Sequence, residues 1–165
     1  MPFVQLFYHL VWATKGRHAV INDAVEPLLY DFMRAKAIGL GGTVFAIGGM
    51  PDHVHLVVSV PPRMALAAFI GQVKGVSSAK LNKGRSAAAQ RFAWQEEYGA
   101  FSFDAKRLPY VIAYVERQKE HHAQQSTIPL LERLEGDSTG YLARESTTAY
   151  LPDYDEWRAF MSRDV

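Results

Sequence analysis

The residues best suited to chemistry in this chain are two histidines separated by one valine, His53-Val54-His55. They open an apolar run that ends at Pro61, and such a run is typical of a β-strand, in which alternate side chains point to the same face. His53 and His55 would then share one face, about 7 Å apart along the backbone at ~3.3 Å per residue. Two imidazoles at this spacing can hold one metal ion. The opposite face, which begins with Val54 and Leu56, is predicted to be core.

A second set of candidate residues lies on a helix that is predicted from Leu108 to about Gln125. One stripe of this helix, at spacings of four, four and three, consists of Tyr110, Tyr114, Gln118 and His121. Tyr114 and Gln118 are therefore neighbours on its surface. A tyrosine hydroxyl can act as a nucleophile, and an amide oxygen can bind a hard cation. An ordinary amphipathic helix with an interfacial tyrosine would show the same stripe, and Tyr110 is a rival nucleophile.

The elements that must position these residues follow the order β-α-β-β-α-β-α. Strands are predicted over residues 3–13, 43–47, 53–60 and 92–103, and two helices precede the one with the tyrosine, one starting near residue 23 and one covering 64–83. The first six elements match the ferredoxin-like α+β arrangement, βαββαβ, with an antiparallel sheet. Both crossover helices would cover one face of the sheet. The histidine pair would then lie in mid-sheet on the open face, for which the third helix, a ligand or a second subunit could provide cover.

The charge distribution suggests a polyanionic partner. The chain has a net charge of +1, yet residues 53–95 contain six basic side chains and no Asp or Glu. Such a segment beside a metal site indicates phosphate binding, although a solvated basic helix face would look the same. The residues expected to contact the phosphates of such a partner are Lys15, Arg17, Lys74, Lys80, Lys83, Arg85 and Arg91.

The composition limits the class of protein. A chain of 165 residues without cysteine fits one globular domain in a reducing compartment and excludes disulfides and thiol nucleophiles. No signal peptide or membrane span is recognisable, so a cytoplasmic location is expected. We predict a catalytic domain over residues 1–125 and a polar, acidic tail over 126–165. The tail should hold a short helix around Leu130–Leu134 and an extended stretch with three aromatic residues, Tyr150, Tyr154 and Trp157.

Taken together and in order, these motifs resemble the single-tyrosine HUH transposases, which are small insertion-sequence enzymes, and their REP-associated tyrosine transposase relatives. The resemblance covers roughly residues 3–125. Besides the His-Val-His strand and the Tyr-Val-x-x-Gln helix, it is carried by the stretches at residues 8–15, 49–56, 74–78, 94–102 and 118–122.

The resemblance implies a role for each matching position. His53 and His55 correspond to the metal ligands, Gln118 to the third protein ligand and Tyr114 to the nucleophile. The implied cofactor is Mg²⁺ or Mn²⁺, and the implied substrate is single-stranded DNA next to a hairpin. Cleavage would give a 5′-phosphotyrosine and a free 3′-OH, so that rejoining needs no nucleotide cofactor. The family relatives often form homodimers, and a homodimer is expected here.

Other histidines and other functions remain open at this point. His121 and His122 could touch the phosphate or the leaving group, or could simply end their helix. His9 is expected to be a satisfied core or rim histidine rather than a ligand. The main alternative function is a non-catalytic or domesticated ferredoxin-like module that binds single-stranded nucleic acid. A small-molecule metal hydrolase is less well supported, because no third His or Glu follows at a suitable spacing.

Overall fold

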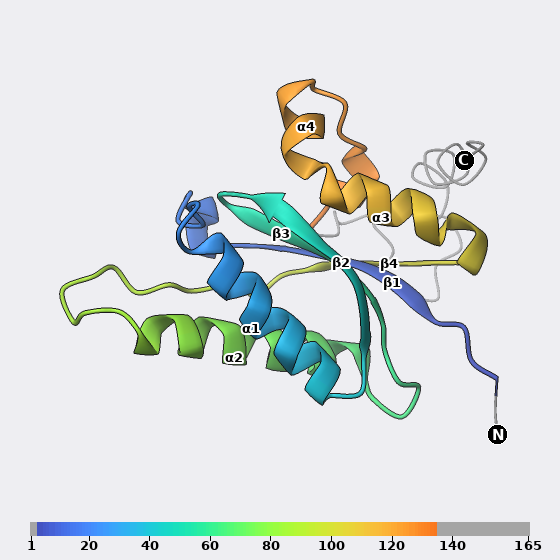
Figure 1. Cartoon of the computed structure of the whole chain (residues 1–165), viewed down its shortest axis with the longest axis horizontal. Coiled ribbons are helices and arrows are strands. Elements are labelled where there is room, and N and C mark those ends of the chain that lie inside the picture. The colour runs from blue at the N-terminus through green and yellow to red at the C-terminus, as the bar shows by residue number, and fades with distance from the viewer. Residues whose placement is uncertain (1–2, 135–165) are drawn as a thin grey trace, which may run out of the picture.

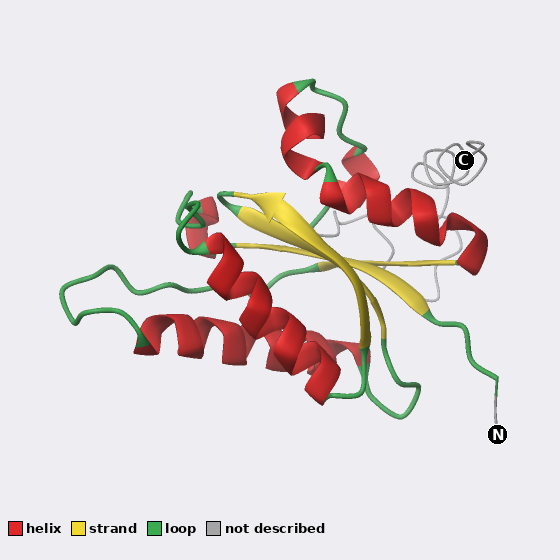
Figure 2. Ribbon diagram, in the orientation of Figure 1, coloured by secondary structure: helices red, strands yellow, loops and turns green. Residues whose placement is uncertain are grey.

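The computed structural model describes residues 3–134 and shows a four-stranded antiparallel sheet with helices on both faces (Figures 1 and 2). The strand order is β2-β3-β1-β4. The strands are β1 (Phe7–Ala13), β2 (Thr43–Met50), β3 (His53–Ser59) and β4 (Gly99–Phe103). The helices are α1 (Glu26–Gly39), α2 (Leu66–Lys83), α3 (Leu108–Glu116) and α4 (Gln118–Ala123), with short 3₁₀ helices η1 (Lys15–Arg17), η2 (Ala105–Arg107) and η3 (Pro129–Glu132). This order and topology confirm the predicted ferredoxin-like class.

The main core lies between the sheet and the pair α1 and α2. Val54, Leu56 and Val58 of β3 point into this core, where they are fully buried. β1 pairs with β3 in antiparallel register, and Leu10 lies opposite Leu56. Strands with this alternation fold as predicted because burying alternate apolar side chains removes them from water on one face.

The other face of β3 carries the two histidines, and α3 covers it (Figure 1). A second apolar cluster joins this face to the helix and includes Val57, Val111 and Val115. Among the candidates for covering the open face, the third helix is therefore the element that packs there.

None of the helices within residues 3–134 is long and apolar enough to span a bilayer.

Several element boundaries differ from those predicted. β1 begins at Phe7 and β2 continues to Met50, through two glycines that were expected to form a turn. Only Gly99–Phe103 of the predicted fourth strand pairs with the sheet, and Trp94 makes an isolated bridge with Thr14. The segment between Trp94 and β4 is held by hydrogen bonds from the side chain of Lys74 to its carbonyls, rather than by pairing with another strand.

The helix predicted to run from Leu108 to about Gln125 is broken in two. Arg117 has φ −103° and ψ 24°, which separates α3 from α4. Neither glycine nor proline marks this position, so the break has no local sequence signal. Its consequence is that Gln118 becomes the first residue of a new helix.

The chain after α4 returns to the sheet. Leu130 and Leu131 of η3 are buried, and Leu131 joins the apolar cluster beneath α3. Gly99 allows this close packing, because a side chain there would collide with the carbonyl oxygen of Arg133. The short helix expected at Leu130–Leu134 is this 3₁₀ turn. The expected tail with Tyr150, Tyr154 and Trp157 lies outside the described residues.

Candidate active site

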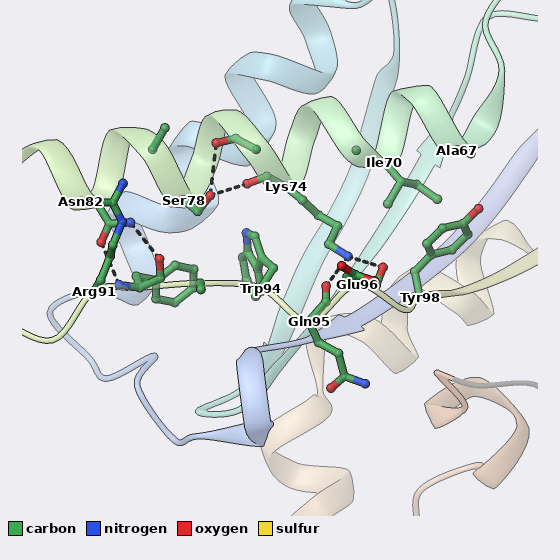
Figure 3. Close-up of a pocket in the computed structure, with 15 residues that line it drawn as sticks. Ala67, Ile70, Lys74, Ser78, Asn82, Arg91, Trp94, Gln95, Glu96 and Tyr98 are labelled. Carbon is green, nitrogen blue, oxygen red and sulfur yellow. Dashed lines mark hydrogen bonds between the residues drawn. The ribbon is translucent and has the colours of Figure 1, made fainter.

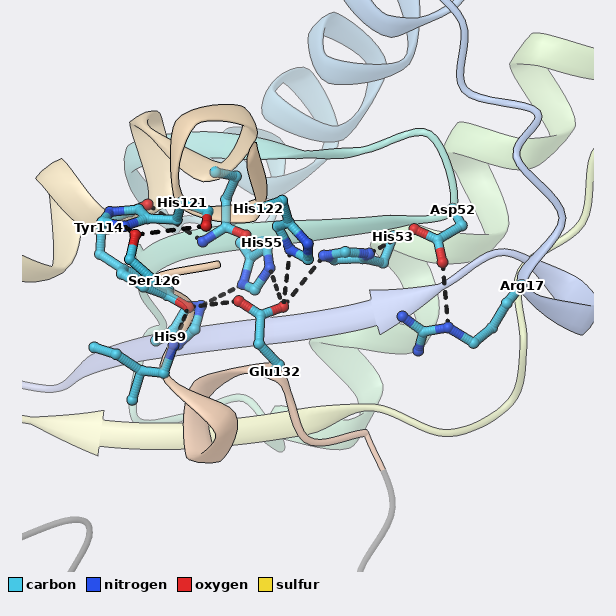
Figure 4. Close-up of polar contacts among 12 residues, drawn as sticks. His9, Arg17, Asp52, His53, His55, Tyr114, His121, His122, Ser126 and Glu132 are labelled. Carbon is cyan, nitrogen blue, oxygen red and sulfur yellow. Dashed lines mark hydrogen bonds and ion pairs between the residues drawn. The ribbon is translucent and has the colours of Figure 1, made fainter. Parts of the chain in front are cut away.

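The two histidines of β3 are buried and point one nitrogen each toward a common centre (Figure 4). His53 is 2% exposed and its Nδ1 lies 2.7 Å from Oδ1 of Asp52. His55 is fully buried and its Nδ1 lies 2.8 Å from Nε2 of His9. With the Nδ1 atoms held by these partners, the Nε2 lone pairs are left for the centre. Imidazoles that bind metal are usually oriented by a second residue in this way.

The environments of the two histidines differ. Burial alone would lower the pKa of His53, but contact with Glu132 and Asp52 outweighs it and raises that pKa. Burial lowers the pKa of His55, and the neighbouring Glu132 only partly offsets it. His9, which sits behind His55, is also fully buried, and this burial holds its pKa well below the ordinary value. His9 is therefore a buried partner of His55, which agrees with the core alternative of the prediction.

Tyr114 reaches the same centre from α3 and is 3% exposed. Its hydroxyl donates to Oε1 of Glu132 at 2.5 Å and accepts from the backbone N–H of Ile128 at 3.0 Å. Burial, followed by the negative charge and hydrogen bond of Glu132, raises the pKa of Tyr114. The hydroxyl is thus held protonated and in a fixed direction.

Gln118 is 1% exposed and lies one turn beyond Tyr114. Its Nε2 donates to the backbone carbonyl of Tyr114 at 3.2 Å. Its Oε1 is buried and has no hydrogen-bond partner among the described residues. A buried amide oxygen without a donor is costly unless something else binds it, and a cation would do so.

Glu132 stands between the histidines and the tyrosine, and sequence reasoning did not single it out. Its Oε2 lies 3.2 Å from Nε2 of His53, 3.2 Å from Nε2 of His55 and 3.7 Å from Nε2 of His122. Burial would raise the pKa of Glu132, but the contacts with His53 and His55 outweigh it and lower that pKa. The carboxyl group is therefore ionised in the folded chain. Nothing in the local sequence marks it, because α4 and a loop separate it from Gln118 and it begins an acidic tail.

The residues at this centre fit a divalent cation. The buried atoms without a hydrogen-bond partner include Nε2 of His53, His55 and His122 and Oε1 of Gln118. Ligand atoms of His53, His122 and Glu132 lie within 4.8 Å of one another. Mixed nitrogen and oxygen donors suit Mn²⁺ and Mg²⁺, and imidazoles also accept Zn²⁺.

The remaining predicted site residues lie around this centre. The ring of His122 is 5.1 Å from that of His53, so it faces the site. The ring of His121 is 4.8 Å from that of Tyr114, and its Nδ1 lies 3.0 Å from the hydroxyl oxygen of Ser126. Tyr110, the rival nucleophile, packs against the apolar cluster beneath α3.

The predicted phosphate contacts fall into two groups. Arg17 of η1 reaches the site indirectly, because it pairs with Oδ2 of Asp52 at 3.2 Å, and Lys15 is exposed beside it. The second group belongs to α2 and the chain that follows, on the sheet face opposite α3 (Figure 1), and consists of Lys80, Lys83, Arg85 and Arg91. Arg85 donates to the carbonyl of Gln90 at 2.8 Å.

Lys74 differs from the other basic residues, because its ammonium is turned into the protein (Figure 3). It is 9% exposed and donates to the carbonyls of Gln95 at 2.5 Å, Glu96 at 2.9 Å and Glu97 at 3.4 Å. These contacts fix the segment before β4 along one side of a groove on α2. They explain the buried charge without a DNA phosphate, so we assign Lys74 a structural role.

The fold agrees with comparisons to known proteins. The family "Transposase IS200 like" matches residues 3–118, well over half of the chain. The chain therefore belongs to the IS200-like transposase family, as its motifs predicted.

Individual relatives show where the likeness lies. The ISDra2 transposase TnpA of Deinococcus radiodurans is 40% identical over 77 residues, which are 47% of this chain and 55% of that protein. The transposase of insertion sequence IS200 from Salmonella typhimurium is 27% identical over 74 residues, 45% of this chain and 49% of that protein. These matches span about half the length of each relative.

Two solved structures share the fold. A candidate transposase from Deinococcus radiodurans R1 is 29% identical, with a TM-score of 0.57 over 71% of this chain and 93% of that one. A REP-associated tyrosine transposase bound to a REP hairpin has a TM-score of 0.55 over 77% of this chain and 73% of its own. At 9% identity, this second likeness concerns the fold alone.

Proposed function

We propose that this chain is a metal-dependent transposase, an HUH endonuclease that cleaves and rejoins single-stranded DNA through Tyr114. The observation that carries the proposal is one carboxylate, Glu132, contacted by the tyrosine hydroxyl at 2.5 Å and by the two histidine nitrogens at 3.2 Å. The tyrosine hydroxyl and the histidine nitrogens contact the same carboxyl group and are therefore close enough to act on one phosphate bound beside it. The family membership supports the same reaction.

Each residue has a role in the proposed reaction. His53, His55 and Gln118 would hold Mg²⁺ or Mn²⁺. Such an ion would draw charge from the scissile phosphate by binding a non-bridging oxygen. Asp52 and His9 fix the direction of the two imidazoles.

Tyr114 provides the covalent step. Its phenolic oxygen forms a bond to phosphorus while the bond from phosphorus to the 3′ oxygen breaks. The tyrosine loses its proton, the leaving 3′ oxygen gains one, and a 5′-phosphotyrosine results. A later attack by a 3′-OH reverses these changes, so no nucleotide cofactor is needed. Because the pKa of Tyr114 is raised in the free chain, the nucleophile is not preformed and must lose its proton in the complex.

The proposed substrate is single-stranded DNA that forms a hairpin. The REP-associated relative was solved with a REP hairpin, and the acid-free segment 53–95 here offers positive charge for a nucleic-acid backbone. A homodimer and a cytoplasmic location, where chromosomal DNA is accessible, belong to the same proposal. A single monomeric species at all concentrations in light scattering would argue against the dimer.

The proposal is tested by mixing the protein with labelled hairpin oligonucleotides and Mg²⁺ or Mn²⁺ and then denaturing it. A covalent adduct that resists detergent, needs metal and disappears in Tyr114→Phe is expected. Tyr110→Phe is the matched control and should still form the adduct. Binding without any adduct across a range of hairpins would favour the non-catalytic module instead.

A further inference from the structure

We propose that Glu132 is a fourth protein ligand of the metal, supplied by the segment that follows the family-matched region, residues 3–118. This inference rests on the proposed metal site and extends it. The three residues carried over from the family resemblance, His53, His55 and Gln118, bind as neutral groups. A carboxylate would add the one negative charge in the set.

The distances around Glu132 are those of neighbouring ligands on one ion. Two atoms bound at about 2.1 Å in adjacent positions lie about 3.0 Å apart in an octahedron and about 3.4 Å apart in a tetrahedron. Oε2 of Glu132 lies 3.2 Å from Nε2 of both His53 and His55, within this interval. Ligand atoms of Glu132, His53 and His122 also all lie within 4.8 Å of one another.

The direction of these contacts shows whether Glu132 lies beside the position of the metal, as a ligand would, or occupies that position itself. If Oε2 occupied the place of the ion, it would lie along the lone-pair axes of the imidazoles and would make good hydrogen bonds to them. Instead, Nε2 of His53 and Nε2 of His55 have no hydrogen-bond partner among residues 3–134. The oxygen thus lies to the side of both ring axes, where a second ligand of the same ion would be.

The chemistry and support of Glu132 also suit this role. Hard cations such as Mn²⁺ and Mg²⁺ prefer carboxylate oxygens to neutral donors. Glu132 is held on η3, whose neighbouring Leu130 and Leu131 are 5% and 1% exposed, so the carboxylate is positioned by a packed turn.

Glu132 would also act as a positioning residue for the nucleophile. Its other oxygen, Oε1, accepts the hydrogen bond from Tyr114 at 2.5 Å. The same side chain thus joins the metal centre to the tyrosine and fixes their separation before DNA arrives.

The inference is tested by Mn²⁺ binding without DNA, followed by electron paramagnetic resonance or calorimetry. Glu132→Gln keeps the size of the side chain and removes its charge, and Glu132→Ala removes the ligand. Both should weaken Mn²⁺ binding by at least about tenfold. Glu120→Gln, an exposed glutamate on α4, is the matched control and should bind Mn²⁺ like the wild type. Thermal melting establishes that each variant is folded.

The outcomes are distinguishable from a failure of the proposed function. Unchanged Mn²⁺ affinity in folded Glu132→Gln and Glu132→Ala would overturn the inference, and so would tighter binding, which would make Glu132 an occluding group. In either case, weaker binding in His53→Ala would leave the histidine site intact. If His53→Ala binds Mn²⁺ like the wild type, the metal site itself is wrong.

Discussion

The histidines of this site depend on the residues behind them. His55 can bind a cation through Nε2 only if its proton is on Nδ1, and that proton then points to His9 Nε2, 2.8 Å away. Asp52 does the same for His53 and is itself held by Arg17. These partners are buried or anchored, so the ligand nitrogens cannot rotate freely.

The role of His9 leads to a prediction. In His9→Ala, the Nδ1–H of His55 loses its buried acceptor, which should cost about 1–3 kcal/mol of unfolding free energy. Mn²⁺ affinity should fall by roughly 10-fold to 100-fold, because His55 is no longer oriented. Urea denaturation and Mn²⁺ titration measure the two effects. His18→Ala, at an exposed position, is the control; equal Mn²⁺ affinity in both variants would show that His9 does not position the ligand.

The ionised Glu132 predicts how stability depends on pH. Because its folded pKa lies below the ordinary 4.5, it stabilises the fold above about pH 4.5, and this contribution is lost as the pH falls below that value. The raised pKa of His53 acts in the opposite sense: its contribution is complete below 6.5 and is lost as the pH rises through the folded pKa.

The metal-free wild type should therefore exceed Glu132→Gln in stability most clearly between about pH 4.5 and 6.5, with a smaller difference at about pH 3. Urea denaturation of both proteins across this range measures the difference. A difference that grows as the pH is lowered from 4.5 to 3 would contradict the assignment of an ionised, histidine-paired Glu132.

At the scale of elements, the position of the tyrosine depends on how closely α3 approaches the sheet. Gly48 of β2 lies directly beneath the helix, and a side chain there would collide with the backbone carbonyl of Val115. Val115 follows Tyr114, so the absence of a side chain at residue 48 determines how close Tyr114 lies to the sheet.

Gly48→Ala should therefore displace α3 and destabilise the fold by about 1–3 kcal/mol, as overpacking does. Adduct formation should fall more steeply than stability alone would cause, because Tyr114 moves with the helix. Gly71→Ala is the control: it has open space in the interior of α2 and should stabilise the chain by about 0.5–1 kcal/mol. Thermal melting and the adduct assay are the measurements, and wild-type adduct yield in Gly48→Ala would refute this packing account.

Much of the fold follows from sequence patterns, and so does the placement of the two histidines on one face of β3. The period-two alternation of β3 correctly predicted which face is core and which carries the histidines. The break at Arg117 and the shortened β4 were not predicted, because tertiary contacts cause them; Lys74, for instance, holds the segment before β4 by its carbonyls. Glu132 was missed for the same reason. It reaches the site only because the chain after α4 folds back onto the sheet.

At the scale of the whole molecule, the basic residues are divided between the site and the opposite face. Arg17 belongs to the site through Asp52, whereas Lys80 and Lys83 lie at the end of α2. If the second group contacts DNA, the bound strand or its hairpin must extend around the edge of the sheet.

Single-stranded DNA binding should report this extended interface. Lys80→Gln combined with Lys83→Gln should weaken binding and reduce the slope of log affinity against log salt by about 0.7 for each phosphate that is no longer neutralised. Lys106→Gln, an exposed lysine outside the acid-free segment, should change neither. Fluorescence anisotropy at several salt concentrations gives both quantities. A double variant with the wild-type slope would confine DNA to the side of α3.

The most direct test of the central claim is to locate the covalent bond. The wild-type protein is incubated with hairpin DNA and Mn²⁺, the DNA is digested, and the modified peptide is sequenced by mass spectrometry. The account predicts a nucleotide joined through its 5′-phosphate to Tyr114, and no such peptide when His53 is replaced by alanine. A modification on Tyr110 or any other residue, or one that persists without the histidine, would contradict it.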